Sequence, residues 1–478
     1  MLFNSIAFGI FLPIVFALYW LLSKKPLIWQ NILLLVSSYY FYGCWDWRFL
    51  FLLMFSTILD FYTGLKMADA ANLSGKRFWF WTSIIINLGF LGIFKYYNFF
   101  ADNLQVALGQ LGLHVDFWTL QVILPVGISF YTFHGLSYVI DIYYNRIEPE
   151  RNFVNYGVFV SFFPLLVAGP IERATHLLPQ VKKARVFNYP QSVDGLRQIL
   201  WGLFKKVVIA DNCAFYANMI FNDHANYNGS TLFLGAVFFS VQIYGDFSGY
   251  SDIALGTARL FGIELLRNFS YPYFSRDIAE FWRRWHISLS SWFKDYLYIP
   301  LGGSKGGKWM QVRNTFAIFL VSGFWHGANW TFIMWGLLNA LYFIPLLLMN
   351  RNRQNLEVVA QNSFFPSFKE VFQMGITFFL STIAWIFFRA ESMTQAWEII
   401  LKIFSTSSFA LPTQRPTIML GAMLLFFMVE WMGRREAFAI QKWTTSWPRV
   451  LRWGFYYLLV ICILLFAGKE QTFIYFQF

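Results

Sequence analysis

The chain has 478 residues, of which 57% are hydrophobic, 22% aromatic and only 13% charged. Soluble domains carry about a quarter charged residues, so this composition excludes an ordinary soluble protein and indicates an integral membrane protein. A net charge of +12 would suggest nucleic acid as the partner of a soluble chain. Here the basic residues cluster in loops between apolar segments, so positive-inside topology explains them better and no nucleic-acid partner is expected.

Apolar stretches recur along the whole chain, and a membrane span needs about 20 mostly apolar residues. Candidate spans are 4–22, 28–45, 48–65, 78–98, 119–144, 153–170, 195–212, 231–260, 314–325, 329–349, 369–388, 416–433 and 450–468. Some are too short or too broken to cross, so we expect an all-α polytopic protein of about 11–13 transmembrane or re-entrant helices. The polar breaks are short, which predicts a single unit over residues 1–478 without a separate globular domain.

Two stretches interrupt the regular alternation of spans and loops. The segment 153–170 contains Pro164, Gly169 and Pro170, and a basic loop follows where a simple count places the outside. We expect a re-entrant half-span beside an internal chamber. Alternatively, one transmembrane span has been miscounted, which would equally explain the basic loop on the unexpected side. The stretch QIYGDFSGYSDIALG sets Asp246 and Asp252 among glycines and serines, which indicates a broken helix facing a polar cavity.

The longest polar stretch, 265–313, carries eight basic and three acidic residues, which places it on the cytoplasmic side. Asp277 followed by Glu280 resembles a capping box, so a helix should begin near Ile278. Glu280 and Arg284 are expected to pair on it at i,i+4 spacing. One apolar face of this helix is expected to lie at the membrane interface and to carry Trp282, Trp285, Leu289 and Trp292.

Metal-binding and hydrolase signatures are missing from the sequence. No two of the six histidines stand at i,i+4 spacing, and the three cysteines lie far apart, so neither a protein metal site nor a disulfide framework is expected. P-loop, GxSxG and GxGxxG signatures are also missing. We therefore expect no bound cofactor, and His134, a lone histidine among aromatic residues, is expected to have a packing role.

The segment FLVSGFWHGANWTFIMWG (319–336) places His326 inside an apolar run. On one helix Ser322 and Asn329 would form a polar stripe with it, and ionisable groups at membrane depth are usually functional. Burial disfavours the imidazolium form, which would leave a neutral ring able to act as a general base on a hydroxyl group.

The same run permits a second interpretation based on helix packing. Gly323 and Gly327 form a GxxxG pair, which allows two helices to approach closely. The histidine would then only bond to a neighbouring helix, and the spacing alone does not decide between the two interpretations.

An ordered set of motifs resembles the membrane-bound O-acyltransferase superfamily, in particular the bacterial branch that contains the alginate O-acetylation membrane protein. The resemblance covers nearly the whole chain and rests on LPVGISFYTFHGLSYVIDIYY, FFPLLVAGPIER, QIYGDFSGYSDIALG, FWRRWHISLS, SGFWHGANWTFIMWG, WIFFRAES and FIYFQF. It implies a ring of tilted helices around a central tunnel. His326 matches the invariant catalytic histidine and His286 matches the second signature position. Weaker candidates for substrate binding are Asp246, Asp252, Arg284, Trp325 and Asn329.

The resemblance also implies a reaction. Acetyl groups from a cytoplasmic donor, acetyl-CoA as a substrate, would pass to an extracytoplasmic polysaccharide such as alginate, directly or through a separate periplasmic acetyltransferase. The protein would lie in the bacterial inner membrane. Alternatives are a peptidoglycan O-acetyltransferase, a D-alanyl transferase of teichoic acid-like polymers, and a non-catalytic transporter. The sequence shows no internal hydropathy repeat of the kind transporters often have, which argues against the last.

Overall fold

The computed structural model describes residues 1–113, 115–120, 124–167, 169–442, 444–468, 471 and 473–474. It is 72% helical, and the described residues contain no strand, which confirms the all-α prediction. Residues 475–478 of the closing FIYFQF motif lie outside the described residues.

Six helices in the described part are long and apolar enough to cross a membrane, which confirms a polytopic membrane protein. They are Ile6–Lys24, Trp47–Ala68, Leu73–Gln110, Gly229–Leu260, Trp330–Leu348 and Phe368–Arg389. Shorter apolar helices lie between them. The total number of crossings and the ring around a tunnel stay predictions.

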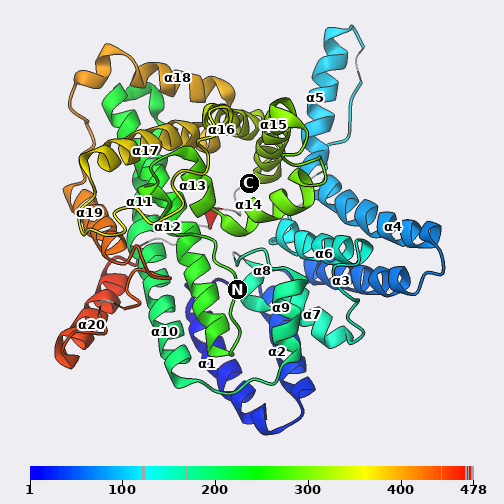
Figure 1. Cartoon of the computed structure of the whole chain (residues 1–478). Helices are drawn as coiled ribbons and strands as arrows, with labels where there is room; N and C mark the ends of the chain where they lie inside the picture. Colours follow the sequence, from blue (N-terminus) through cyan, green and yellow to red (C-terminus); the bar gives the residue numbers. More distant parts are fainter. Residues whose placement is uncertain are drawn as a thin grey trace. The chain divides into compact units, whose positions relative to one another are not determined.

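The first of two compact units comprises Met1–Gln191 and Ala258–Leu266. Its helices are α1 (Ile6–Leu21), α2 (Leu27–Gly43), α3 (Trp47–Ala68), α4 (Leu73–Leu91), α5 (Tyr97–Gln110), α6 (Ile128–Tyr143), α7 (Phe153–Ser161), α8 (Phe163–Leu166) and α9 (Ala174–Lys182) (Figure 1). A π-helical stretch, Gly92–Tyr96, joins α4 to α5, so one helical rod extends well beyond the span 78–98 predicted from hydropathy.

The segment 153–170 is broken, as its prolines and glycine predict. Asn152 caps α7 by accepting the N–H groups of Val154 and Asn155, and the helix ends where Phe162 leaves helical geometry (ψ 116°). The nine residues of α7 cover about 14 Å, about half of the hydrocarbon core. This segment therefore forms two short helices, whereas the internal chamber stays a prediction.

His134 on α6 is buried inside the first unit. Its Nε2 accepts the backbone N–H of Glu172 at 3.1 Å, and its Nδ1 lies 3.4 Å from the carbonyl oxygen of Val160. Both contacts join α6 to the segment around α7 and α9, in agreement with the expected packing role.

The second unit comprises Ser192–Thr257 and Arg267–Phe478. Its helices are α10 (Tyr189–Leu203), α11 (Asp211–Asn222), α12 (Gly229–Leu260), α13 (Ile278–Arg284), α14 (Ile287–Phe293), α15 (Gly307–His326), α16 (Trp330–Leu348), α17 (Phe368–Arg389), α18 (Met393–Ile403), α19 (Thr417–Met432) and α20 (Arg449–Leu465). The first residues of α10 and the last of α12 belong to the first unit.

The expectation that QIYGDFSGYSDIALG forms a broken helix is wrong, because α12 runs through it without interruption for 32 residues. Its glycines serve close packing against the α10 side. A Cβ on Gly249 would lie only 2.8 Å from the carbonyl oxygen of Gly202 and 3.1 Å from the backbone nitrogen of Lys206. The glycines in this stretch therefore mark helix contact rather than a helix break.

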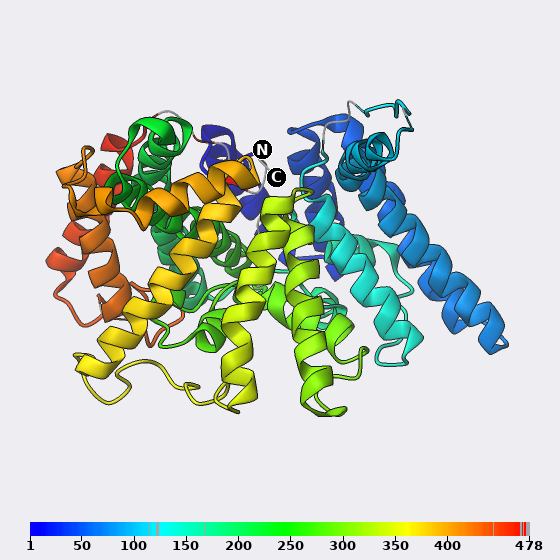
Figure 2. The same ribbon diagram turned by 90° about the horizontal axis from the view of Figure 1, so that it is seen from above.

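α15 and α16 form a tightly packed helical hairpin in the second unit, and the two helices lie side by side in both views (Figures 1 and 2). A Cβ on Gly323 would lie 2.3 Å from the carbonyl oxygen of Phe332, and one on Gly336 would lie 2.3 Å from that of Phe319. Glycine at both positions lets the two backbones touch. The packing interpretation is thus correct for Gly323, although it does not exclude a function for the histidine that follows.

Candidate active site

His326 is the last residue of α15, because Gly327 adopts an extended conformation (φ −163°, ψ 147°). Asn329 then starts the next helix as its N-cap, and its side chain accepts the N–H of Thr331 at 3.1 Å. An N-cap residue has non-helical dihedral angles, so it cannot extend the face of the preceding helix. The predicted polar stripe is therefore correct for Ser322, one turn before His326, and wrong for Asn329.

The helix expected near Ile278 begins there, and the Asp277 side chain caps it by accepting the N–H of Glu280 at 2.7 Å. Glu280 also pairs with Arg284 at 2.9 Å, as predicted. The helix ends at Arg284, however, and α14 begins only at Ile287. The expectation of one continuous helix is therefore wrong.

His286 stands at this break with φ 43° and ψ 53°, a left-handed conformation that residues other than glycine rarely adopt. Asn268 fixes the break, since its carbonyl accepts the N–H of Ile287 at 2.9 Å and its side-chain oxygen accepts the hydroxyl of Ser288 at 2.5 Å. Such backbone strain costs about 1–3 kcal/mol and persists only where surrounding contacts enforce it. The orientation of His286 therefore depends on a contact 18 residues upstream.

The apolar face predicted for an interfacial helix is instead turned into the protein. Trp285 is 1% exposed, and Leu289 and Trp292 are also buried. Because the helix breaks, Trp285 lies in the junction and stacks over Phe281 at 5.5 Å between ring centroids. The tryptophans of this segment are thus part of the core of the second unit.

The breaks after α13 and α15 bring the two predicted catalytic histidines together. The ring centroids of His286 and His326 lie 6.3 Å apart. The rings around them, here called the aromatic cage, belong to Phe247, Trp325, Trp335, Trp385 and Phe388. Trp335 and Phe388 meet His326 edge-on at 5.1 and 5.3 Å, and Phe247 meets His286 edge-on at 4.7 Å. Four helices and the α13–α14 junction thus converge on two imidazoles.

The cage removes both histidines from water, with exposed fractions of 1% for His286 and 4% for His326. Burial lowers the pKa of His286 to about 3. Its imidazole is therefore neutral at physiological pH and has one nitrogen that donates a proton and one that accepts. Such a group can polarise a reacting carbonyl or receive a proton without first losing one to solvent.

A cavity of about 240 Å³ lies in the second unit close to the histidine pair. Ser322 lines it from α15, one helical turn before His326. Trp282 lines it from α13 and meets Trp335 of the cage edge-on at 5.6 Å. Its walls are mostly apolar, while the exposed side chains of Lys294 and Arg353 give it a basic edge. Four residues, or about 6 Å along the helix axis, separate Ser322 in the cavity wall from His326.

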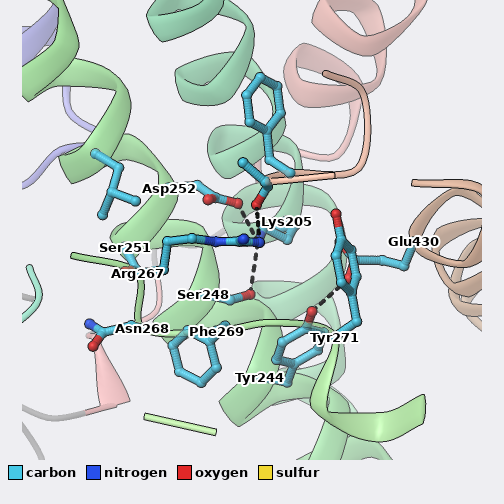
Figure 3. Close-up of a pocket in the computed structure, with 13 residues that line it drawn as sticks. Lys205, Tyr244, Ser248, Ser251, Asp252, Arg267, Asn268, Phe269, Tyr271 and Glu430 are labelled. Carbon is cyan, nitrogen blue, oxygen red and sulfur yellow. Dashed lines mark hydrogen bonds and ion pairs between the residues drawn. The ribbon is translucent and has the colours of Figure 1, made fainter. Parts of the chain in front are cut away.

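The carboxylates of α12 lie in a separate, charged cluster. Lys205 pairs with Asp252 at 2.6 Å and donates to the Ser248 hydroxyl at 2.9 Å (Figure 3). Lys206 pairs with Asp246 at 2.7 Å. The small cavity beside Lys205 measures about 20 Å³, enough for about one water molecule. Both carboxylates thus neutralise buried lysines, and substrate binding by Asp246 and Asp252 stays a prediction.

The three other predicted binding residues have different surroundings. Trp325 belongs to the cage, 4.9 Å from His326 and 6.1 Å from His286 between ring centroids. Arg284 donates to the carbonyl of Glu357 at 3.0 Å and so ties α13 to the loop before α17. Asn329 donates to the carbonyl of Glu391 at 3.3 Å. Contact with the histidine pair is therefore found for Trp325, whereas the other two fix loops.

Sequence reasoning missed two asparagines that position the site. Asn268 holds the junction at His286, and Asn339 accepts the indole N–H of Trp282 at 3.2 Å while donating to the carbonyl of Trp335 at 2.8 Å. Asn339 is 3% exposed in the middle of α16. Buried amides are almost always hydrogen-bonded, so an asparagine such as Asn339 inside an apolar run indicates a structural contact. This was the signal in the sequence that could have identified it.

The region that contains the site is similar to known proteins. The model of the membrane-bound O-acyltransferase family matches residues 144–388, which contain both histidines and the whole aromatic cage. A probable alginate O-acetylase of Pseudomonas syringae pv. tomato is 38% identical over 413 residues, covering 86% of this chain and 76% of that protein.

Two further relatives differ in what their names say they act on. A peptidoglycan O-acetyltransferase of Helicobacter pylori is 36% identical over 430 residues, covering 84% of this chain and 79% of the relative. A teichoic acid D-alanyltransferase of Bacillus subtilis is 30% identical over 229 residues, covering 45% of this chain and 57% of the relative. The similarity therefore extends across acyl groups but is longer for the acetyltransferases.

Proposed function

We propose that this chain transfers acetyl groups to an extracytoplasmic polysaccharide. The chain belongs to the membrane-bound O-acyltransferase family and is a multi-pass membrane O-acyltransferase. The observation that carries the proposal is the pair of buried imidazoles, 6.3 Å apart, beside a cavity that approaches from α13 and α14. Relatives named as O-acetylases match most of the chain and favour acetyl as the acyl group.

The two histidines supply the groups that acetyl transfer from a thioester needs. The acceptor hydroxyl oxygen attacks the thioester carbonyl carbon while His326 takes the hydroxyl proton. A neutral His286 donates its N–H to the developing oxyanion. The carbon–sulfur bond then breaks, and His326 returns the proton to the leaving sulfur, which leaves an ester and a free thiol. General acid–base catalysis of this kind contributes typically about 10²–10⁴-fold.

The cavity suits the narrow arm of a thioester donor better than a whole cofactor. Drug-sized ligands occupy pockets of about 300–1,000 Å³, and this one has about 240 Å³. Its mostly apolar walls fit an arm, and the basic edge at Lys294 and Arg353 complements an anionic head group left outside. Acetyl-CoA, as a substrate rather than a resident cofactor, has both features.

The acceptor side is assigned by similarity. The relatives are named for alginate and for peptidoglycan, so the acceptor proposed here is a cell-envelope or exported polysaccharide such as alginate. Transfer takes place directly or through a separate periplasmic acetyltransferase. The enzyme then lies in the bacterial inner membrane, with the stretch 265–313 and the donor on the cytoplasmic side.

Acetyl ester on envelope polysaccharide tests this proposal in cells. His326→Ala and His286→Ala are compared with His134→Gln, which changes a buried histidine outside the cage. All values are normalised to inserted protein. We expect ester content to fall to background in the first two variants and to persist in the third. Unchanged ester content in His326→Ala overturns the catalytic assignment.

The same variants also distinguish transfer of acetyl groups from transfer of D-alanine. If His326→Ala removes D-alanine ester and leaves acetyl ester intact, the chain is a D-alanyl transferase like the shorter-matching Bacillus subtilis relative. Transport of polymer without consumption of thioester would instead favour a transporter.

A further inference from the structure

A short segment near the end of the chain docks against α12 inside the second unit. Of its described residues, Phe473 and Ile474 are buried, with exposed fractions of 0% and 1%. The backbone makes the polar contacts: the carbonyl of Gln471 accepts from Lys206 Nζ at 3.2 Å, and the Ile474 N–H donates to Asp246 Oδ2 at 2.8 Å. Two charged side chains thus hold the backbone at Gln471 and at Ile474.

These two side chains also hold each other. Lys206 Nζ lies 2.7 Å from Asp246 and 2.8 Å from Asp211. Lys206 comes from a π-helical stretch, Phe204–Ala210, between α10 and α11, and Gly249 lets this stretch approach α12 closely. π-helical turns inside helices frequently occur at functional sites. The pair Lys206 and Asp246 is here called the clasp.

The segment held by the clasp supports the aromatic cage. Phe473 packs on Tyr250 at 4.5 Å and on Phe247 at 6.3 Å between ring centroids. Phe247 in turn meets His286 edge-on at 4.7 Å. Loss of Phe473 would remove one of the rings that pack on Phe247 and so weaken the support of the ring that α12 places against His286.

We infer that Lys206 and Asp246 are positioning residues, which hold the backbone at Gln471 and Ile474 so that Phe473 and Phe247 keep His286 in place beside His326. This role rests on the acyl transfer proposed above for the histidine pair. The clasp is not part of the aromatic cage around the histidines. It also contributes no residue to the donor cavity, so its loss should reduce kcat and leave the KM for the donor unchanged.

The chain offers a matched control. Lys205 and Asp252 form a second buried ion pair, at 2.6 Å, between the same two helical segments. The atoms that Lys205 and Asp252 contact belong to Ser248 and Gln198, and not to the segment 471–474. Removing both partners of a pair leaves neither of its two charges buried alone, although loss of Lys206 also removes the cation that pairs with Asp211.

The test places a reporter cysteine, Ile474→Cys, in a background with Cys44→Ser and Cys462→Ser, which leaves only the buried Cys213. Maleimide labelling in native membranes and acetyl transfer from acetyl-CoA are measured for the reporter alone, for Lys206→Met/Asp246→Leu and for Lys205→Met/Asp252→Leu. Hydrogen bonds to charged groups are strong, so the clasp variant should label at least about tenfold faster. Transfer should fall at least about tenfold at unchanged donor KM, and the control pair should keep slow labelling.

Each other outcome contradicts the inference. Unchanged labelling in the clasp variant shows that the clasp does not hold the segment. Fast labelling with full transfer shows that the segment does not position the site. If both double variants lose transfer equally and both label slowly, the clasp is only a structural ion pair with no specific positioning role. Absence of acetyl transfer in the wild-type protein overturns the proposed function instead, while the labelling result still reports on the clasp.

Discussion

Replacing Gly323 by alanine should separate α15 from α16 and move His326 away from its partners. The added Cβ would lie 2.3 Å from the carbonyl oxygen of Phe332 and 3.1 Å from its carbonyl carbon. Both are backbone atoms, so no side chain can rotate away. To restore an ordinary contact of 3.4 Å the helices must part by about 1.1 Å.

His326 is three residues further along the same helix, so much of this displacement reaches its ring. A misplacement of about 1 Å can cost about 10²-fold in rate, while overpacking costs typically about 1–3 kcal/mol of stability. We expect kcat for acetyl transfer to fall about 100-fold and the protein to remain inserted, at a reduced melting temperature.

Gly375→Ala is the matched control for this change. Gly375 lies on α17, which carries Trp385 and Phe388 of the cage, and a Cβ there meets nothing within 4 Å. Donor consumption and thermal unfolding in detergent are measured for both variants. If Gly323→Ala transfers acetyl at the rate of Gly375→Ala, the helix contact does not position His326 and the reasoning fails.

Three further variants examine other parts of the account. His286→Asn retains a residue that tolerates the left-handed backbone, so folding should persist while transfer falls at least about 100-fold, and wild-type turnover would contradict a role for the imidazole. Ser290→Trp should fill the donor cavity and raise the KM for acetyl-CoA at least about tenfold; an unchanged KM would place the donor elsewhere. The hydrogen bond that His176 donates to the Glu172 carboxylate raises the pKa of His176, so the native state binds this proton more tightly than the unfolded chain and gains stability below the unfolded pKa of about 6.5. That gain disappears as the pH rises through the native pKa, so His176→Gln should lower the melting temperature more at pH 5 than at pH 9, and equal losses would refute the linkage.

Local signals in the sequence predicted local structure well. Composition identified the membrane class, Asp277 marked the start of α13, and Pro164, Gly169 and Pro170 marked the broken segment. Each of these effects acts within a few residues of its cause, so no knowledge of tertiary contacts was needed.

The site geometry depends on contacts between distant residues, which the sequence pattern does not contain. Periodicity predicted one helix across His286, but Asn268 breaks it there. Glycines around Asp246 suggested a helix break, although they only admit a neighbouring backbone. The resemblance to a family identified both histidines, and the structure adds that they lie within 6.3 Å of each other between ring centroids.

In the proposed reaction, His326 catalyses acyl transfer from a cytoplasmic thioester. Inverted inner-membrane vesicles from producing cells expose the cytoplasmic face to labelled acetyl-CoA and retain the acceptor and any partner. Label incorporated into polysaccharide, per inserted protein, should fall at least about 100-fold in His326→Ala and stay near the wild-type level in His134→Gln. Wild-type incorporation by His326→Ala would contradict the account.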